Sequence, residues 1–355
     1  YGVEQYLPEC LDSVLAAPAA GLEVIAIDDA SPDGCGELLD ARAKLDPRLQ
    51  VVHLPANLGP GHGRNLGLAM AAGDYVWFVD GDDTLPAGAL AAVAARLTAD
   101  LPDLLLIDYA DRYPDGSSAP SPGAALLRAA PPGSFTLAQQ PHLVNLTMTA
   151  WSKVFGRAFL QGLGVPFPAG IHEDILVTCS ALLAAGRIAA LVQPCYQYRR
   201  ARPGSFMVTT SRDHLAIFES YRQVFELAAS RLAAGDPGLT AAVQAALFER
   251  AIWHYTTILQ PGGVVAGALA RGGVVPRGER RAFFARMHSD FLRYRPASYR
   301  TPAGARGAKF RLVERGAYRT YTLLEPVNAA RVRLRRAAAA RRPGRVPAGG
   351  AETPT

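Results

Sequence analysis

Three aspartates lie within four residues of one another at the end of a short apolar run. Asp80, Asp82 and Asp83 follow residues 74–79, which have the composition of a buried strand. Carboxylates this close repel one another, so a fold keeps them together where a cation or hydrogen-bond donors offset the cost. A divalent cation is commonly held by one or two carboxylates and phosphate oxygens. The cluster predicts a Mg²⁺ or Mn²⁺ site for a diphosphate or, with equal weight, an aspartate-rich turn in which Asp83 caps the next helix.

A second acidic pair ends an earlier apolar run. Asp28 and Asp29 follow residues 23–27 and precede a turn at residues 31–34. Parallel strands end at the same edge of a sheet, where α/β folds bind ligands, so we expect both acidic groups at one edge. A carboxylate there accepts hydrogen bonds from a ribose or a base. The alternative is that it only braces the 31–34 turn.

The elements that must position these acids alternate along the first hundred residues. Apolar runs with the length of buried strands are separated by stretches of helical period. This order predicts an α/β fold with a mostly parallel, Rossmann-like central sheet and helices on both faces. The expected strands are residues 23–28, 49–54, 74–79 and 103–108, and the expected helices are 7–15, 35–44, 64–72 and 86–99.

The remaining chain is expected to be more helical. Residues 113–135 are rich in Pro, Gly, Ser and Ala and predict an excursion or a mobile loop. No stretch of about 18 residues is apolar throughout, so we expect no membrane span. The four cysteines form no C-x-x-C pair, which favours a reducing compartment. Helices are expected over residues 173–185, 212–260 and 279–294, with a break at 262–273 and a basic helix near the end.

The net positive charge comes from the last fifty residues. The net charge is +6, but residues 304–355 contain twelve Arg or Lys against three Glu, a balance of +9 that leaves −3 for residues 1–303. The acidic body argues against nucleic acid as a partner. The basic tail predicts either peripheral contact with an anionic membrane or an interdomain linker.

Five motifs, in their order and spacing, resemble those of family 2 glycosyltransferases, which have the GT-A fold. The resemblance implies inverting transfer of a sugar from a nucleotide sugar, most simply a UDP-sugar. The first motif begins at Tyr1, which it assigns to the donor site; because residue 1 is not Met, we expect a fragment that lacks the family's first strand. The motifs are residues 1–7, 10–15, 28–34, 63–67 and 80–83.

The resemblance also implies roles for the donor-side residues. Asp29 would contact the uracil or ribose, and Asp28 would brace it. Arg64 would lie near the base or the diphosphate. Asp80 would approach the ribose and the metal, and Asp82 would be the principal ligand of Mn²⁺ or Mg²⁺.

Inversion requires a base that accepts the proton of the acceptor hydroxyl. The sequence His172-Glu173-Asp174 resembles the family's Glu-Asp motif, which makes Asp174 the base. Glu173 would orient the acceptor or the base, and His172 would have no chemical role. The alternative is structural, because acids favour helix N-termini in any protein.

A basic segment follows the next expected strand. Residues 196–205 resemble the part of the family that folds over the donor diphosphate. Arg199 and Arg202 are the candidates for phosphate contact, since guanidinium groups bind phosphate in bidentate fashion. The competing interpretation is a solvated basic loop.

Three further segments, residues 135–138, 209–214 and 312–318, resemble the transferase part of actinobacterial proteins that continue into a CDP-glycerol glycerophosphotransferase-like domain. This predicts a teichoic-acid-type glycopolymer or polyol-phosphate acceptor and a cytoplasmic location, peripheral at the inner face of the membrane. The alternatives are a non-catalytic binding or docking module and a nucleotidyltransferase. The expected divisions are a nucleotide-sugar half (1–110), an acceptor half (111–205), a helical extension (206–300) and a tail or linker (301–355).

Overall fold

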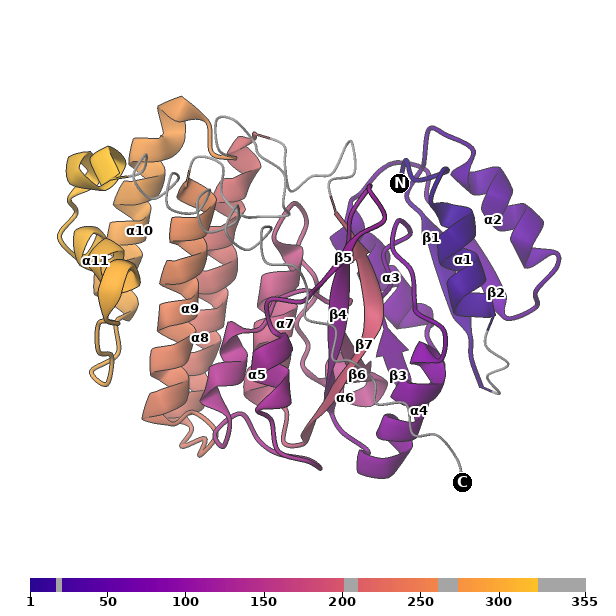
Figure 1. Cartoon of the computed structure of the whole chain (residues 1–355), viewed down its shortest axis with the longest axis horizontal. Coiled ribbons are helices and arrows are strands. Elements are labelled where there is room, and N and C mark those ends of the chain that lie inside the picture. Colours follow the sequence, from indigo (N-terminus) through magenta and orange to yellow (C-terminus); the bar gives the residue numbers. More distant parts are fainter. Residues whose placement is uncertain (17–20, 201–209, 261–273, 325–355) are drawn as a thin grey trace, which may run out of the picture.

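The computed structural model describes residues 1–16, 21–200, 210–260 and 274–324. A parallel pair of strands lies at one side of the molecule, a five-stranded sheet at its centre and a group of helices at the other side (Figure 1). The N-terminal elements are α1 (Leu7–Leu15), β1 (Val24–Asp28), α2 (Cys35–Ala43), β2 (Leu49–His53) and α3 (Pro60–Met70).

The N-terminal unit forms because helices α1 and α2 bury apolar faces against the β1–β2 pair. Leu7, Leu11 and Leu15 repeat every four residues on α1 and pack with Leu39 of α2 and Leu49 of β2. The two strands are parallel, and their register ends with Asp28 opposite His53. The acidic end of β1 therefore lies at the carboxyl edge of a parallel pair, but β3 (Tyr75–Trp77) belongs to another sheet, so the expectation that both acidic groups end at one edge of a single parallel sheet is corrected.

The central sheet is more mixed than the sequence predicts. The sheet has the order β3–β6–β4–β5, and β7 also pairs with β4. Only the β4–β7 pair is parallel. Strand β6 is too short to show a period in the sequence, yet it separates β3 from β4. The strands are β3 (Tyr75–Trp77), β4 (Leu104–Arg112), β5 (Ser118–Pro120), β6 (Lys153–Gly156) and β7 (Ile188–Arg199).

The expectation of an excursion or a mobile loop at residues 113–135 is corrected, because this segment contains a strand and a helix. Strand β4 continues to Arg112, and the chain turns at Gly116 (φ +82°) so that β5 pairs with the end of β4. Helix α5 (Ala124–Arg128) then buries Leu127. Alanine and proline obscured this pattern because neither contributes a recognisable apolar period.

The helices cover the sheet and continue its core. In α7, every residue from Ile175 to Leu183 is buried, because this helix lies between the sheet and α8. One apolar cluster runs from Phe78 to Tyr321, so the core is continuous across the boundary expected at 205/206. The remaining helices are α4 (Ala89–Asp100), α6 (Arg157–Gly162), α7 (Glu173–Ala184), α8 (Ala216–Ala233), α9 (Ala241–Leu259), α10 (Arg280–Tyr294) and α11 (Gly304–Glu314).

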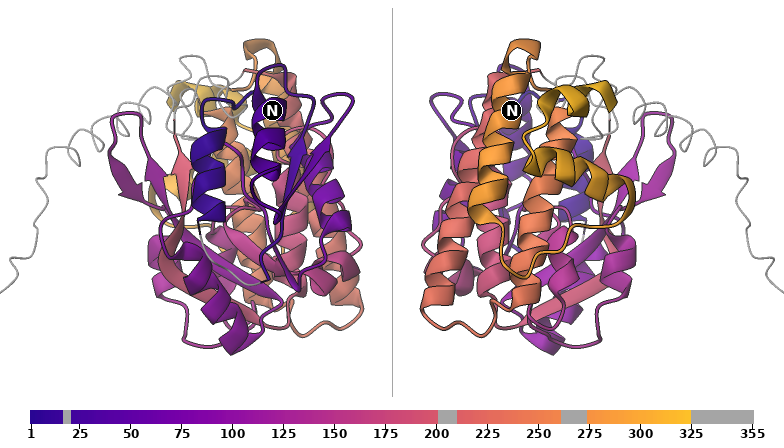
Figure 2. Two further views of the ribbon diagram at one scale, coloured as in Figure 1. Left: turned by 90° about the vertical axis from the view of Figure 1, so that its right-hand side faces the viewer. Right: turned by 90° about the vertical axis from the view of Figure 1, so that its left-hand side faces the viewer.

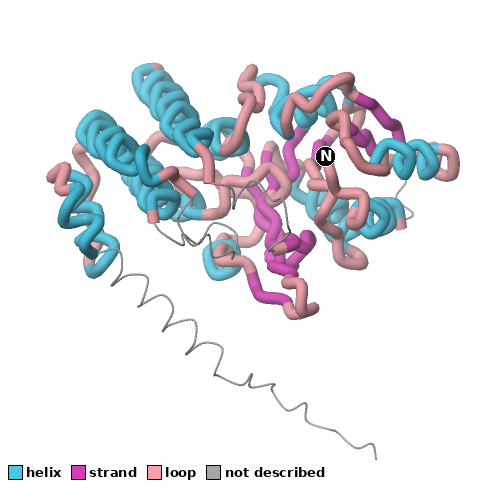
Figure 3. Tube along the Cα trace, turned by 90° about the horizontal axis from the view of Figure 1, so that it is seen from above, coloured by secondary structure: helices cyan, strands magenta, loops and turns pink. Residues whose placement is uncertain are grey.

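The C-terminal helices form a layer of their own beside the sheet (Figures 2 and 3). The long helical stretch expected at 212–260 is two helices, α8 and α9, because the chain turns at Gly235 (φ +77°) and α9 begins after the capping hydroxyl of Thr240. Within the described part of the chain, no helix combines the length and the apolar character that crossing a membrane requires. Residues 325–355, most of the basic tail, lie outside the described residues.

Candidate active site

Arg64 joins the donor-side and acceptor-side acids in one cluster. Its Nη2 donates to Asp80 Oδ1 at 3.0 Å, and its Nη1 donates to Glu173 Oε1 at 2.5 Å and to Asp174 Oδ1 at 2.7 Å. Only 11% of the Arg64 side chain is exposed. Burial alone would lower the pKa of Arg64, but the charges of Asp174, Asp80 and Glu173 raise it above its usual value. The structure thus brings together four residues that the sequence assigned to one site.

Asp174 has one hydrogen bond to each carboxylate oxygen. Arg64 binds Oδ1, and the backbone N–H of Ala150 donates to Oδ2 at 3.1 Å. Burial raises the pKa of Asp174, and the guanidinium of Arg64 opposes this rise. Burial and the charge of Asp174 raise the pKa of Glu173 to about 7. A held, poorly hydrated carboxylate with lone pairs remaining on both oxygens is suited to accept a proton from a hydroxyl group.

His172, for which the sequence suggested no chemical role, determines how α7 begins. It has a left-handed conformation (φ +66°), which is uncommon for a residue other than glycine. Its ring is buried, and Nε2 lies 3.1 Å from His214 Nδ1. The His254 ring lies edge-on to it at 5.7 Å, and His254 Nδ1 is 3.2 Å from the Tyr221 hydroxyl. The histidines hold the turn that directs Glu173 and Asp174 toward Arg64.

These buried histidines predict a loss of stability in mild acid. Burial lowers the pKa of His172 to about 3 and that of His254 well below its usual value. The unfolded chain protonates both below about pH 6.5, so it binds more protons than the folded chain and the free energy of unfolding falls as pH decreases. Below about pH 6.5, each histidine should contribute a fall of about 1.4 kcal/mol per pH unit, which the raised pKa of Glu173 opposes. Urea denaturation between pH 7 and 5 measures the net slope.

His172→Asn tests this, because asparagine tolerates the left-handed conformation. The substitution should reduce the slope of the free energy of unfolding against pH by the contribution of one histidine. His53→Asn is the control, since His53 is partly exposed and its pKa is raised by Asp40 and Asp28. That change should not flatten the dependence, and an unaltered slope in His172→Asn would contradict the assignment.

Asp83 anchors the acidic loop rather than facing the ligand. It is 1% exposed, its Oδ2 accepts from the Tyr196 hydroxyl at 2.8 Å, and its Oδ1 accepts from the backbone N–H of Arg199 at 2.7 Å. Burial and the charges of Asp82 and Asp80 raise its pKa well above the usual value. Helix α4 starts after Gly88, so the alternative that Asp83 caps that helix is wrong. Tyr196, on which the sequence placed no role, is the residue that fixes this loop.

Asp80 and Asp82 are left as the carboxylates suited to a divalent cation. The Asp80 side chain is 35% exposed, and Asp82 is partly exposed. In the described ranges, no group of three or more His, Cys, Asp or Glu is arranged to hold a metal. Two carboxylates with diphosphate oxygens and water as further ligands match the usual requirement of Mg²⁺. The residues therefore fit a cation that binds together with the donor.

The Arg199 side chain contacts other residues of the protein. Its Nε donates to the Asp82 carbonyl at 2.7 Å, its Nη2 to Glu9 Oε2 at 2.7 Å, and its guanidinium lies 4.6 Å from the Tyr6 ring. Phosphate contact by Arg199 stays a prediction, and Arg202 lies outside the described residues. The sequence analysis did not identify Glu9 as a site residue. Glu9 follows Tyr6 by one helical turn, and this spacing was the signal that both could contact the same residue, Arg199.

The acids at the end of β1 brace loops. Asp28 Oδ1 accepts from the Ser31 N–H at 3.1 Å, and Oδ2 lies 3.1 Å from His53 Nδ1. Burial opposes ionisation of Asp28, but these bonds lower its pKa below the usual value. Asp29 accepts from the backbone N–H groups of Leu58 and Gly59 at 2.7 and 2.8 Å, just before α3. Contact with a base or ribose by Asp29, or by the half-exposed Tyr1, stays a prediction.

Comparison with known proteins finds similarity to glycosyltransferases. Residues 1–160 match the model of the family described as glycosyl transferase family 2. The uncharacterized glycosyltransferase EpsJ of Bacillus subtilis is 28% identical over 202 residues, covering 56% of this chain and 58% of EpsJ. The poly(ribitol-phosphate) beta-N-acetylglucosaminyltransferase TarS of Staphylococcus aureus is 32% identical over 213 residues, covering 58% of this chain and 35% of TarS. The chain thus matches between a third and three fifths of these relatives.

A solved structure of S. aureus TarS 1–349 in complex with UDP-GlcNAc has the same fold. It superimposes with a TM-score of 0.70 at 23% sequence identity, covering 93% of this chain and 89% of that one. The match extends through the C-terminal helices as well as the sheet. It confirms the predicted α/β fold class with a helical extension.

Proposed function

Since residues 1–160 match the model of glycosyl transferase family 2, we propose that this chain transfers a sugar with inversion from a UDP-sugar to a hydroxyl of a polyol-phosphate glycopolymer. The observation that supports this most directly is the Arg64 cluster. It places the candidate base Asp174 and the donor-side Asp80 on the same guanidinium group, at 2.7 and 3.0 Å. UDP-GlcNAc is the first donor to test, because it is bound in the TarS complex.

In the proposed reaction, an acceptor hydroxyl lies at Asp174 and attacks the anomeric carbon of the donor sugar. A carbon–oxygen bond forms to the acceptor while the bond to the β-phosphate breaks, and its electron pair leaves with the nucleoside diphosphate. The hydroxyl proton passes to Asp174. A Mg²⁺ or Mn²⁺ ion held by Asp80 and Asp82 would offset the charge that develops on the diphosphate.

The remaining residues of the cluster bind and orient. Arg64 and the Ala150 N–H hold the two oxygens of Asp174, so the proton acceptor has a fixed direction. Glu173, with a pKa near 7, accepts from Arg64 and lies beside the base, where it can orient an acceptor hydroxyl. Asp83 and Tyr196 hold the 80–83 loop against β7.

Turnover by the purified chain tests this proposal. We expect release of UDP from a UDP-sugar in the presence of Mn²⁺ and loss of release on chelation. Asp82→Ala should reduce turnover by about 100-fold or more, because it removes a metal ligand. Asp12→Ala, an aspartate exposed on α1, is the control and should leave turnover unchanged.

The alternatives give different results in the same assay. A chain that turns over no UDP-sugar would favour a non-catalytic binding or docking module. This holds whether the chain binds a nucleotide sugar or binds no nucleotide. Release of pyrophosphate from a nucleoside triphosphate would indicate a nucleotidyltransferase. Either result would overturn the proposal.

Two finer expectations belong to the same proposal. A glycerophosphotransferase-like domain is expected to act with this transferase, and the basic tail is expected to bring it to an anionic membrane surface. Sedimentation with anionic vesicles, with and without residues 304–355, measures the second expectation, and equal sedimentation would remove it.

A further inference from the structure

Lys153, the first residue of β6, is a buried cation without an obvious reason to be there. Its side chain is 1% exposed, and it forms no ion pair with any residue in the described ranges. Burying a charge is costly unless hydrogen bonds and opposite charges compensate for it. An apolar residue would fill the same place in the sheet at lower cost.

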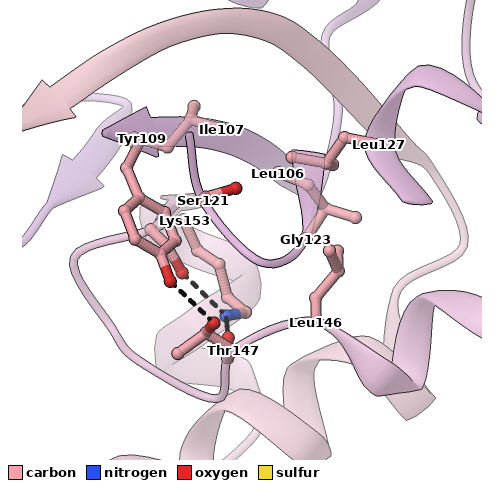
Figure 4. Close-up of a pocket in the computed structure, with 10 residues that line it drawn as sticks. Leu106, Ile107, Tyr109, Ser121, Gly123, Leu127, Leu146, Thr147 and Lys153 are labelled. Carbon is pink, nitrogen blue, oxygen red and sulfur yellow. Dashed lines mark hydrogen bonds between the residues drawn. The ribbon is translucent and has the colours of Figure 1, made fainter. Parts of the chain in front are cut away.

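The ammonium group binds one short loop three times. Nζ donates to the carbonyl of Thr147 at 2.8 Å, to the carbonyl of Thr149 at 3.0 Å and to the hydroxyl of Ser152 at 3.2 Å. Figure 4 shows the lysine reaching Thr147 beside the Tyr109 hydroxyl, which lies 3.0 Å from Thr147 Oγ1. The three bonds use the full donor capacity of the ammonium group and fix the loop at residues 147–152.

The middle of this loop holds the candidate base. Ala150 is fully buried, and its N–H donates to Asp174 Oδ2, the oxygen that Arg64 does not bind. A cavity of about 10 Å³ beside Lys153, lined in part by Tyr109, Ser121 and Thr147, leaves the loop space for little more than one water molecule. Without the ammonium group, the loop would have to satisfy its carbonyls in another way and would shift.

The lysine also acts on Asp174 through its charge. Burial lowers the pKa of Lys153 to about 8, and the charge of Asp174 opposes this fall, so the lysine is mostly protonated at pH 7. The charged groups that face Asp174 are Arg64 of α3, Asp80 of the loop after β3, Glu173 of α7 and Lys153 of β6.

We propose that Lys153 is a positioning residue for the general base: it fixes the 147–152 loop so that the Ala150 N–H aligns Asp174, and its charge favours the ionised carboxylate. The proposal rests on the function proposed above. The core of the sheet does not require a lysine at this position, and the proposal explains its presence by a role in proton acceptance.

Lys153→Met tests the proposal, because methionine fills similar space without a charge or a donor. We expect kcat to fall about 100-fold, as small displacements of a catalytic group produce losses of that order. KM for the UDP-sugar should stay within about twofold, because the donor-side loops are untouched. The acidic limb of the kcat/KM profile should move about one pH unit upward, because loss of a nearby positive charge raises the pKa of Asp174.

Arg250→Met is the matched control. Arg250 is also buried and also donates to a backbone carbonyl, that of Asn145, but it does not bind the 147–152 loop. It should lower stability and leave the acidic limb in place. If Lys153→Met does not fold, Ser152→Ala removes one of the three acceptors and should lower kcat several-fold at constant KM.

The two proposals fail in different ways. A wild-type chain that turns over no UDP-sugar contradicts the proposed function. If the wild type is active but the acidic limb of its kcat/KM profile does not move in Lys153→Met, only the role of Lys153 is contradicted. The same holds if the limb moves equally in Arg250→Met. In the Ser152→Ala arm, a rise in KM without a change in kcat would do the same.

Discussion

Asp174→Asn is expected to lower sugar transfer by about 10³-fold or more while the chain still binds the nucleotide sugar. The amide has nearly the shape of the carboxylate but cannot accept the acceptor's proton, and general bases contribute about 10²- to 10⁴-fold. The substitution also removes one acceptor oxygen, either from Arg64 Nη1, which keeps its bond to Glu173, or from the Ala150 N–H. UDP release measures the loss, and calorimetry with the UDP-sugar measures binding.

Glu173→Gln is the matched control for this experiment. It removes one negative charge from the same guanidinium group, one residue away on the same helix. If Asp174 is the base, Glu173→Gln should retain at least a tenth of the turnover, because it alters orientation and leaves the proton acceptor in place. Equal losses in both variants, or turnover in Asp174→Asn within tenfold of the wild type, would remove Asp174 as the base.

The sequence was sufficient for the strands that carry the acids. The run that ends at Asp28 and the run before Asp80 are both short and apolar, as buried strands are, although β1 lies in a parallel pair and β3 pairs antiparallel with β6. Their order also predicts the α/β class, which the fold confirms. The sequence could not show that β6 separates β3 from β4, because four residues carry no period and strand order depends on contacts far apart in the chain.

The residues of the Arg64 cluster were predicted as a set, but the contacts within the cluster were not. Arg64 was expected near the base or diphosphate, and the structure places it among three carboxylates on two halves of the fold. This contact depends on how α3 meets α7, which local periodicity does not encode. The same holds for Asp83 and Tyr196, 113 positions apart. The left-handed conformation of His172 is equally invisible in a sequence where glycine is the usual marker.

The connection through Arg64 has the larger structural consequence. Asp80, Glu173 and Asp174 all accept from this one guanidinium, and the side chains of Glu173 and Asp174 are only 12% and 13% exposed. Removing one partner of a buried ion pair typically costs about 3–5 kcal/mol, because a charge is left without compensation. Arg64→Met should therefore destabilise the chain by about that amount and eliminate turnover, whereas Arg222→Met, at exposed pairs with Glu219 and Glu226 on α8, should have little effect.

The pH dependence of that destabilisation identifies its cause. Without Arg64, the pKa values of Glu173 and Asp174 should rise further, since burial already raises both and the guanidinium is the main opposing charge. A carboxyl whose pKa is higher in the folded state than in the unfolded chain stabilises the fold at low pH, and that stability is lost as pH rises through the folded-state pKa. Arg64→Met should thus lose more stability relative to the wild type at pH 8 than at pH 5, measured by urea denaturation. A deficit of equal size at both pH values would mean that the guanidinium acts by packing, for example against the Phe167 ring 5.7 Å away, rather than by holding the acids.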